Sequence, residues 1–148
     1  MTDDYDTRAE AARLTDPIEK SIINWAKVDA FWNSDLGRRF IAAYDRGQAA
    51  REQQFIVALP ISEVLPGKDV KSPGETVMVQ GIIDMFFEEP DGLVLVDYKT
   101  DRVFNGDQLV MRYKTQLDYY EKALCMLTGK RVKERYLYSF FLEKEIRC

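Results

Sequence analysis

Residues 79–103 read VQGIIDMFFEEPDGLVLVDYKTDRV, and this stretch decides the fold. Apolar and β-branched residues dominate both sides of Glu89-Pro90-Asp91-Gly92, which is made of residues that favour turns. Two extended runs joined by a short turn are typical of a β-hairpin. The sequence therefore predicts one strand over 75–87, a tight connection over 89–92 and a second strand over 93–98.

Charged residues interrupt the apolar pattern of this hairpin. Side chains alternate along a strand, so Asp97 and Lys99 share one face with Leu93 and Leu95, while Asp84 belongs to the neighbouring strand. We therefore expect two carboxylates and one ammonium to converge at a sheet edge among aliphatic residues. Isolated charges are costly in such a place, so these groups need one another or a cation.

Two facing carboxylates suit a hard divalent ion. Mg²⁺ and Mn²⁺ prefer oxygen ligands, and water and a substrate phosphate complete their coordination. The main-chain carbonyl of Tyr98, between Asp97 and Lys99, would add a further oxygen. Lys99 would orient or deprotonate the attacking water and offset charge on a phosphate. The structural alternative is a buried Asp97–Lys99 ion pair, with Asp84 capping a turn.

Two helices are predicted ahead of the strands. The first begins with Asp16 as its N-cap and Pro17 at its first position. The second spans about 34–46, and Phe31 and Trp32 fall in the joint between the two helices. Apolar residues at helical spacing predict that the second helix buries Leu36, Phe40, Ile41 and Tyr44.

The remaining elements follow in a simple order. Residues 54–64 have the pattern of a strand, and turn-forming residues follow at 66–69 and 72–74. After the hairpin, a long helix is predicted from 108 to about 127, and a final strand over 132–142. The order α-α-β-β-β-α-β favours an α/β or α+β sandwich with helices on the faces of a sheet.

The composition excludes several kinds of chemistry. The chain has 148 residues and no histidine, and its two cysteines, Cys125 and Cys148, form no CxxC pair. Within these residues, imidazole-based catalysis and histidine or cysteine metal clusters are therefore excluded. No apolar run is long enough for a membrane span and the acidic start is not a signal peptide, so we expect a cytoplasmic protein.

Charge is uneven along the chain. Residues 1–96 carry 10 Lys and Arg against 17 Asp and Glu, whereas residues 97–148 carry 11 against 8. The C-terminal third could therefore face an anionic ligand, although charges scattered over a solvated surface are the simpler interpretation.

The spacing of the charged residues resembles a nuclease motif. Asp84, followed after twelve residues by Asp97-Tyr98-Lys99, resembles the PD-(D/E)xK motif in its RecB-like form. Tyr113-x-x-Gln116-Leu117-x-x-Tyr120 is similar to the additional motif of RecB-like nucleases. Together with AFWNSDLGRRFIAAYDRGQAAREQQF, the stretches around these motifs resemble the C-terminal nuclease domain of AddA-type helicase–nucleases. The resemblance covers about residues 17–142 and implies a restriction-endonuclease-like fold, α/β with a central mixed sheet flanked by helices.

The resemblance also implies roles for individual residues. Asp84 and Asp97 would hold the metal together with the Tyr98 main-chain carbonyl, and Lys99 would act on the water and the phosphate. The catalytic set implied in this way is Asp84, Asp97, Lys99, Gln116 and Tyr120. The candidate DNA contacts are Tyr113, Arg102, Arg112 and Lys114. The alternatives are half-buried core aromatics for the two tyrosines and a solvated helix face for the basic residues.

The family resemblance implies an activity and partners. The chain would be the nuclease domain of an AddAB-type complex and would hydrolyse DNA, mainly single-stranded, as an exonuclease during double-strand break processing for recombinational repair. It would use Mg²⁺, with Mn²⁺ as a substitute. ATP would serve only the linked helicase, because this chain has no GxxxxGK[ST] loop. The expected partners are DNA, the helicase domains of the same full-length chain, and an AddB-type partner protein.

One feature departs from this family. RecB-like nucleases usually place a metal-site histidine on an upstream helix, and this chain has none. We therefore expect a fragment, with a flexible segment over 1–16 and an N-terminally truncated nuclease domain over 17–148, that binds Mg²⁺ poorly and cuts slowly or not at all. The main alternative is a catalytically silent nuclease-like module that binds DNA or a partner. A standalone nuclease of phage or defence type is a weaker one.

Overall fold

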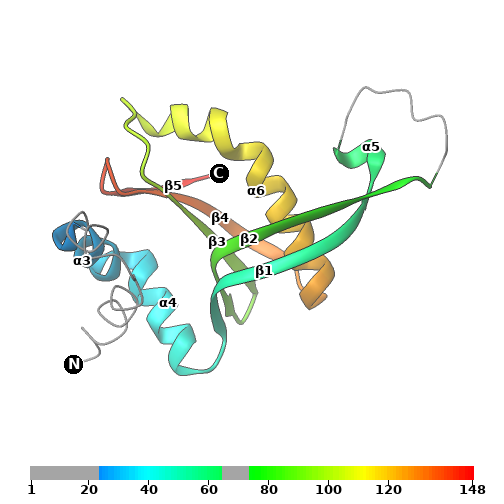
Figure 1. Ribbon diagram of the computed structural model, residues 1–148. Helices are drawn as coiled ribbons and strands as arrows, with labels where there is room; N and C mark the ends of the chain where they lie inside the picture. Colours follow the sequence, from blue (N-terminus) through cyan, green and yellow to red (C-terminus); the bar gives the residue numbers. More distant parts are fainter. Residues whose placement is uncertain (1–23, 65–73) are drawn as a thin grey trace, which may run out of the picture.

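The computed structural model describes residues 24–64 and 74–148, which are built around one five-stranded sheet (Figure 1). The strands are β1 (Ala49–Pro60), β2 (Thr76–Glu89), β3 (Gly92–Lys99), β4 (Val132–Ser139) and β5 (Lys144–Arg147), in the sheet order β1-β2-β3-β4-β5. Neighbouring strands are antiparallel except β3 and β4, which are parallel. The predicted hairpin is confirmed as β2 and β3, and the sheet is mixed.

The helix α6 (Gly106–Thr128) connects the parallel strands β3 and β4, as a parallel pair requires. Asn105 caps its start by accepting a hydrogen bond from the Gln108 N–H. The helix ends at Gly129, whose φ of 68° is a left-handed conformation that glycine adopts without strain. This predicted helix is confirmed, and it begins two residues earlier than expected.

The two faces of the sheet are covered by different helices (Figure 1). On one face, Leu109, Leu117 and Leu124 of α6 form a core with residues of the sheet that include Leu93 and Leu95. On the other face, α3 (Trp25–Asn33) and α4 (Asp35–Asp45) pack against the alternate residues of the sheet. The residues buried on this second face are Phe31, Leu36, Phe40, Ala43, Met85, Phe87, Val94, Val96, Tyr136 and Tyr138. Both faces of β3 are apolar, so helices cover the sheet on both sides and the structure has three layers.

The boundary between the first two helices differs from the prediction. Phe31 and Trp32 lie inside α3, and the two helices are separated at Ser34 instead. The Ser34 hydroxyl donates to the Phe31 carbonyl and accepts from the Gly37 N–H, so it ends one helix and caps the next. A side chain at position 37 would collide with the Phe31 carbonyl, which explains the glycine. The predicted start at 16–17 lies outside the described residues.

The expected burial of Tyr44 is wrong. Its side chain is 51% exposed and stacks on the ring of Phe40, while the small Ala43 takes the buried position. Ile41 is only half-buried. The helix is rotated so that Leu36, Phe40 and Ala43 face the sheet, at the i, i+4, i+7 spacing of one helical stripe.

Several strand boundaries also differ. β1 starts at Ala49, five residues before the predicted strand, because β2 pairs with its polar beginning along the whole length from Ala49↔Phe87 to Pro60↔Thr76. The short helix α5 (Ile61–Val64) replaces the predicted end of this strand. The last predicted strand is two: β4 ends at Ser139, a turn follows, and β5 pairs back on β4. The turn-forming residues at 66–69 and 72–73 lie outside the described residues.

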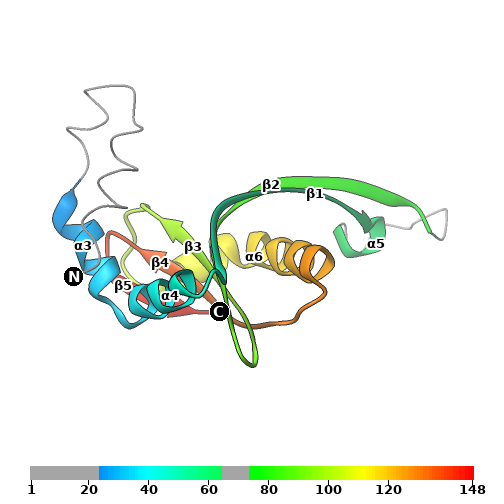
Figure 2. The same cartoon turned by 90° about the horizontal axis from the view of Figure 1, so that it is seen from below.

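The β1–β2 pair bends at Glu52 and Asp84. The ladder pairs Arg51 with Met85 and Gln53 with Ile83, and Glu52 between them has a φ of 51°. Met85 packs on the α4 side of the sheet, whereas Ile83 packs on the α6 side. Figure 2 shows the two strands turning sharply and then arching over α6. Asp84 thus lies at the corner where the strand pair changes direction.

In the part of the chain that the structure describes, no helix is long and apolar enough to cross a membrane.

Candidate nuclease site

Asp84 is held where β2 and β3 separate. The ladder between these strands runs from Glu89↔Gly92 to Met85↔Val96 and stops there. Just past its end, the Tyr98 backbone N–H donates to Asp84 Oδ2 at 2.8 Å. A side chain therefore replaces the main-chain partner at the point of separation, and the carboxylate of Asp84 is tied to the strand that carries Asp97.

Asp97 is the most deeply buried charged residue of the site. It is 2% exposed, and its Oδ2 atom accepts no hydrogen bond from the described residues. The ammonium Nζ of Lys99 lies 2.7 Å from this oxygen and forms an ion pair with it. Burial raises the pKa of Asp97 to about 6, and the charge of Asp84 acts in the same direction, whereas Lys99 opposes the shift. Asp97 therefore has one cationic partner, Lys99, whose effect on the pKa is smaller than that of burial.

Lys99 is surrounded on three sides. Besides the ion pair with Asp97, its Nζ donates to Gln116 Oε1 at 2.8 Å. The same ammonium lies 3.9 Å from the centroid of the Tyr113 ring, a cation–π contact. Since the Lys99 side chain is only 13% exposed, these contacts fix the position of its charge.

Gln116 and Tyr120 extend this arrangement along α6. Gln116 Nε2 donates to the Tyr120 hydroxyl at 3.0 Å, and the Tyr120 ring meets Phe55 of β1 edge to face. Burial raises the pKa of Tyr120, and the nearby charges of Asp97 and Asp84 add to the effect. Tyr120 therefore lies near both carboxylates and also packs against the β1–β2 pair.

Gly81 makes that close packing possible. A Cβ atom at this position would lie 3.0 Å from the Phe55 ring and 3.2 Å from the Tyr120 ring. Gly81 belongs to the stretch 79–103, but the need for a glycine there comes from Tyr120, far along the chain. No local sequence signal therefore reveals it.

The predicted DNA-contact residues lie at the start of α6 and in the loop before it. Arg102 and Lys114 are exposed. Arg112 pairs with Asp101 at 3.1 Å, and the Tyr113 hydroxyl donates to the same carboxylate at 2.9 Å. Asp101 is the residue of this region that the sequence did not single out. The only sequence signal for it is its position two residues after Lys99, just past the end of β3.

The residues present fit a divalent cation held mainly by oxygen. Asp84 and Asp97 supply two carboxylates, one of which has a buried oxygen without a hydrogen-bond donor among the described residues. Within the ranges 24–64 and 74–148, no group of three or more His, Cys, Asp or Glu side chains gathers in a way that could hold a metal. A cation bound here would therefore take its other ligands from main-chain oxygen, water or substrate.

This combination defines a class of protein. A mixed sheet with Asp84 on one strand and Asp97-x-Lys99 on the next, at the point where the strands part, is the arrangement of a PD-(D/E)xK nuclease. The family model of the PD-(D/E)XK nuclease superfamily matches residues 2–146, and the chain belongs to this superfamily.

The relatives of the chain are much longer proteins. It is 45% identical over 133 residues to an ATP-dependent helicase/nuclease subunit from Clostridium perfringens (strain ATCC 13124), a match that covers 87% of this chain and 10% of that protein. It is 43% identical over 134 residues to the protein of the same name from Acetivibrio thermocellus, covering 88% and 10%. The protein of that name from Lachnoclostridium phytofermentans is 38% identical over 159 residues, covering 86% and 12%. The chain spans about a tenth of the length of these relatives.

Proposed function

We propose that the chain is the nuclease domain of an AddA-type helicase–nuclease and that it hydrolyses phosphodiester bonds of DNA. The convergence of Asp84, Asp97 and Lys99 where β2 and β3 part is the observation that carries this proposal. Membership of the nuclease superfamily and the similarity to helicase/nuclease subunits support it.

We propose further that Asp84 and Asp97 hold a divalent cation, Mg²⁺ with Mn²⁺ as a substitute. The burial of Asp97 beside Asp84 supports this, because the single ammonium of Lys99 does not offset both the loss of water and the second carboxylate. The main-chain carbonyl of Tyr98 is the proposed third ligand. When bound, such an ion polarises the phosphate and makes water more acidic.

The protein's own side chains would do the rest. One N–H of Lys99 would donate to Gln116 and another would point towards the phosphate. There the ammonium would offset the charge that develops on the phosphate oxygens. Gln116 fixes the direction of that ammonium, and the Tyr120 hydroxyl fixes Gln116. Because Lys99 and Asp97 stand on one face of one strand, the cation and the ammonium would act on the same phosphate.

DNA would approach over the start of α6. Arg102 and Lys114 are exposed there and would neutralise backbone phosphates, and Arg112 and Tyr113 border the site. We propose that the substrate is mainly single-stranded DNA, which a linked helicase would supply. An AddB-type partner, exonuclease action and a role in double-strand break processing for recombinational repair belong to the same proposal, and the names of the relatives support the helicase link.

The proposal is tested by incubating the chain with an end-labelled single-stranded oligonucleotide in Mg²⁺, in Mn²⁺ and in excess chelator. Slow cleavage that needs the cation, and that disappears in Asp97→Ala, is the expected result. Cleavage that survives the chelator, or that persists in Asp97→Ala, would contradict the assignment of the site.

A second function is favoured by one observation, namely the small number of acidic ligands in the described residues. A cation with two carboxylates keeps most of its water and binds weakly. The chain would then be a nuclease-like module that binds DNA or a partner without cutting it. Single-strand binding without cleavage at saturating Mn²⁺ would favour this second function.

A further inference from the structure

Asp101 makes contacts that point to a role in the site. Its Oδ1 and Oδ2 atoms lie 3.1 and 2.9 Å from the Tyr113 hydroxyl, and the hydroxyl donates the hydrogen bond. This bond is the main reason why the pKa of Asp101 is lowered. The carboxylate joins the loop after β3 to the first half of α6.

The ring held by this bond faces the lysine of the site. Tyr113 places its ring centroid 3.9 Å from Lys99 Nζ, so the ammonium contacts this ring as well as Asp97 and Gln116. A tyrosine ring has two soft side-chain torsions, and packing or a hydrogen bond at its far end is needed to fix its plane. Asp101 supplies such a hydrogen bond, so the chain of contacts runs Asp101–Tyr113–Lys99.

We propose that Asp101 is a positioning residue of this nuclease site: it holds the Tyr113 ring against the Lys99 ammonium and thereby keeps that ammonium directed at the reacting phosphate. The inference rests on the proposed nuclease function. It adds a residue outside the acidic pair, the lysine and the Gln116–Tyr120 pair.

The number of contacts to the ammonium explains why the Tyr113 ring matters. Lys99 has three N–H bonds and, among the described residues, three neighbours in Asp97, Gln116 and Tyr113. If Asp97 also served a bound cation, Gln116 and Tyr113 would be the two groups left to keep the ammonium in place. Loss of the Tyr113 contact would leave it held at one point, around which it could swing.

A direct test reads the position of the lysine without any cleavage. The ring current of Tyr113 moves the ε-methylene protons of Lys99 upfield, and the signal is assigned by its loss in Lys99→Ala. We expect Tyr113→Leu to abolish the upfield shift, Asp101→Ala to reduce it, and Asp101→Asn to preserve most of it, because the amide oxygen still accepts from the hydroxyl. Asp107→Ala, which removes an exposed carboxylate from the first turn of α6, is the matched control and should leave the shift unchanged.

A cleavage assay then tests the consequence. Asp101→Ala should lower kcat by roughly tenfold, the lower end of the range seen when an outer partner of a site residue is removed, with KM unchanged. Tyr113→Phe keeps the ring but lacks the hydroxyl, so Asp101→Ala in that background should cause no further loss.

The outcomes separate the possibilities. An upfield shift that is unchanged in Asp101→Ala overturns the proposal, and so does a rise in KM with unchanged kcat, which would mean that Asp101 acts through Arg112 on DNA binding. Additive losses in the double variant overturn it as well. A wild-type chain that does not cut overturns the proposed function instead, and the shift of the Lys99 protons then decides alone whether Asp101 positions the lysine.

Discussion

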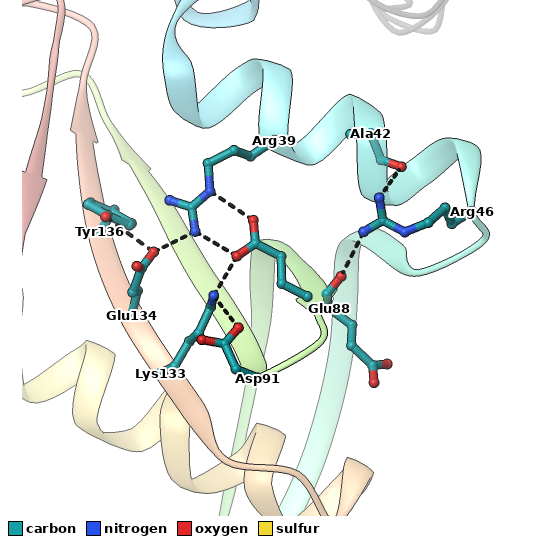
Figure 3. Close-up of polar contacts among 9 residues, drawn as sticks. Arg39, Ala42, Arg46, Glu88, Asp91, Lys133, Glu134 and Tyr136 are labelled. Carbon is teal, nitrogen blue, oxygen red and sulfur yellow. Dashed lines mark hydrogen bonds and ion pairs between the residues drawn. The ribbon is translucent and has the colours of Figure 1, made fainter.

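The carboxylates of the nuclease site differ in their partners from those of a second charged cluster, which lies beside α4 and the β2–β3 turn. The second cluster, which we call the Arg39 cluster, consists of Arg39, Glu89, Asp91, Lys133 and Glu134. Figure 3 labels Arg39, Asp91, Lys133 and Glu134 of this cluster. Arg39 donates to both oxygens of Glu89 at 2.8 and 2.9 Å and to Glu134 at 2.7 Å. Lys133 pairs with Glu89 and Asp91. Every carboxylate of this cluster therefore contacts a cation.

The two clusters move carboxylate pKa values in opposite directions. The hydrogen bonds from Arg39 lower the pKa of Glu89 to about 2, although its partial burial opposes the shift. Burial raises the pKa of Asp97 to about 6, because its single lysine does not offset the loss of water and the charge of Asp84. For the pKa of Glu89, the bidentate hydrogen bonds from the Arg39 guanidinium outweigh desolvation. For the pKa of Asp97, desolvation outweighs the single ammonium of Lys99.

We infer from this difference that the Arg39 cluster stabilises the fold, whereas the nuclease site keeps a carboxylate for a ligand. The Arg39 cluster joins α4, the β2–β3 turn and β4, and its charges have partners within the chain. The nuclease site leaves a buried oxygen of Asp97 without a hydrogen-bond donor among the described residues. Substitutions in the two clusters should therefore affect different properties.

The largest effect is expected for Asp97→Asn. Loss of the carboxylate removes a proposed cation ligand, and cleavage should fall by roughly a thousandfold, since cation assistance is worth several kcal/mol. The thermal midpoint should be unchanged or higher, because the substitution removes a charge that burial disfavours. Cleavage assays and thermal unfolding followed by circular dichroism measure the two effects. A protein that loses stability in parallel with activity would assign Asp97 to the fold.

Lys99→Ala should also impair cleavage strongly, by roughly a hundredfold, while cation binding persists. Lysine stabilises charge on the phosphate but is not a metal ligand. Its removal also frees the Asp97 oxygen from the ion pair at 2.7 Å, so Mn²⁺ should bind as tightly as before or more tightly. Calorimetric titration with Mn²⁺ checks this, and weaker binding in Lys99→Ala would contradict the assigned role.

Arg39→Met should reverse this pattern. It leaves Glu134 without its guanidinium and Glu89 with Lys133 alone, so the free energy of unfolding should fall by about 1–3 kcal/mol. Cleavage per folded molecule should not change. Urea unfolding measures the stability, and Arg38→Met, at an exposed position of the same helix, is the matched control. Equal stability of the two variants would show that the cluster contributes nothing.

The Arg39 cluster should also make stability depend on pH in acid. The folded-state pKa of Glu89 is about 2, below its ordinary value of 4.5, so its contribution is fully present above about pH 4.5 and is lost as the pH falls towards 2. Glu89→Gln should flatten that part of the profile, whereas Glu75→Gln, at an exposed position, should not. Urea unfolding at several pH values between about 6 and about 2.5 measures the slope. An identical slope in wild type and Glu89→Gln would refute the prediction.

Smaller effects on cleavage than those of Asp97→Asn and Lys99→Ala are expected for Tyr120→Phe and Gln116→Ala. Each removes one hydrogen bond that positions Lys99 and leaves the carboxylates untouched, so kcat should fall by roughly tenfold or less. Tyr120→Phe keeps the ring against Phe55, which makes it the cleaner variant. Full activity in both, with an unchanged circular dichroism spectrum, would mean that this face of α6 serves packing only.

Much of the fold could be predicted from the sequence because local signals decided it. The Pro90-Asp91-Gly92 turn between two apolar runs specifies the β2–β3 hairpin, and Gly129 ends α6. The alternation of β3 predicts that Asp97 lies with Leu93 and Leu95, which pack on the α6 side, and the Asp97–Lys99 pair reaches Gln116 of that helix. The turn, the helix end and the alternation depend on neighbours within a few residues, for which periodicity and turn chemistry are sufficient, whereas the contact with Gln116 depends on the packing of α6 on the sheet.

The tertiary structure decided what depends on distant partners. The polar start of β1 is a strand because it forms main-chain hydrogen bonds with β2. β5 is a strand because it pairs with β4 at the edge of the sheet. The corner at Glu52 and Asp84, which aims the Asp84 carboxylate at Tyr98, arises where the strand pair passes from the α4 side to the α6 side. The contact of Asp101 with Tyr113 joins a loop to a helix. The sequence by itself determined which chemical groups are present, and only packing between distant segments determined which of them meet.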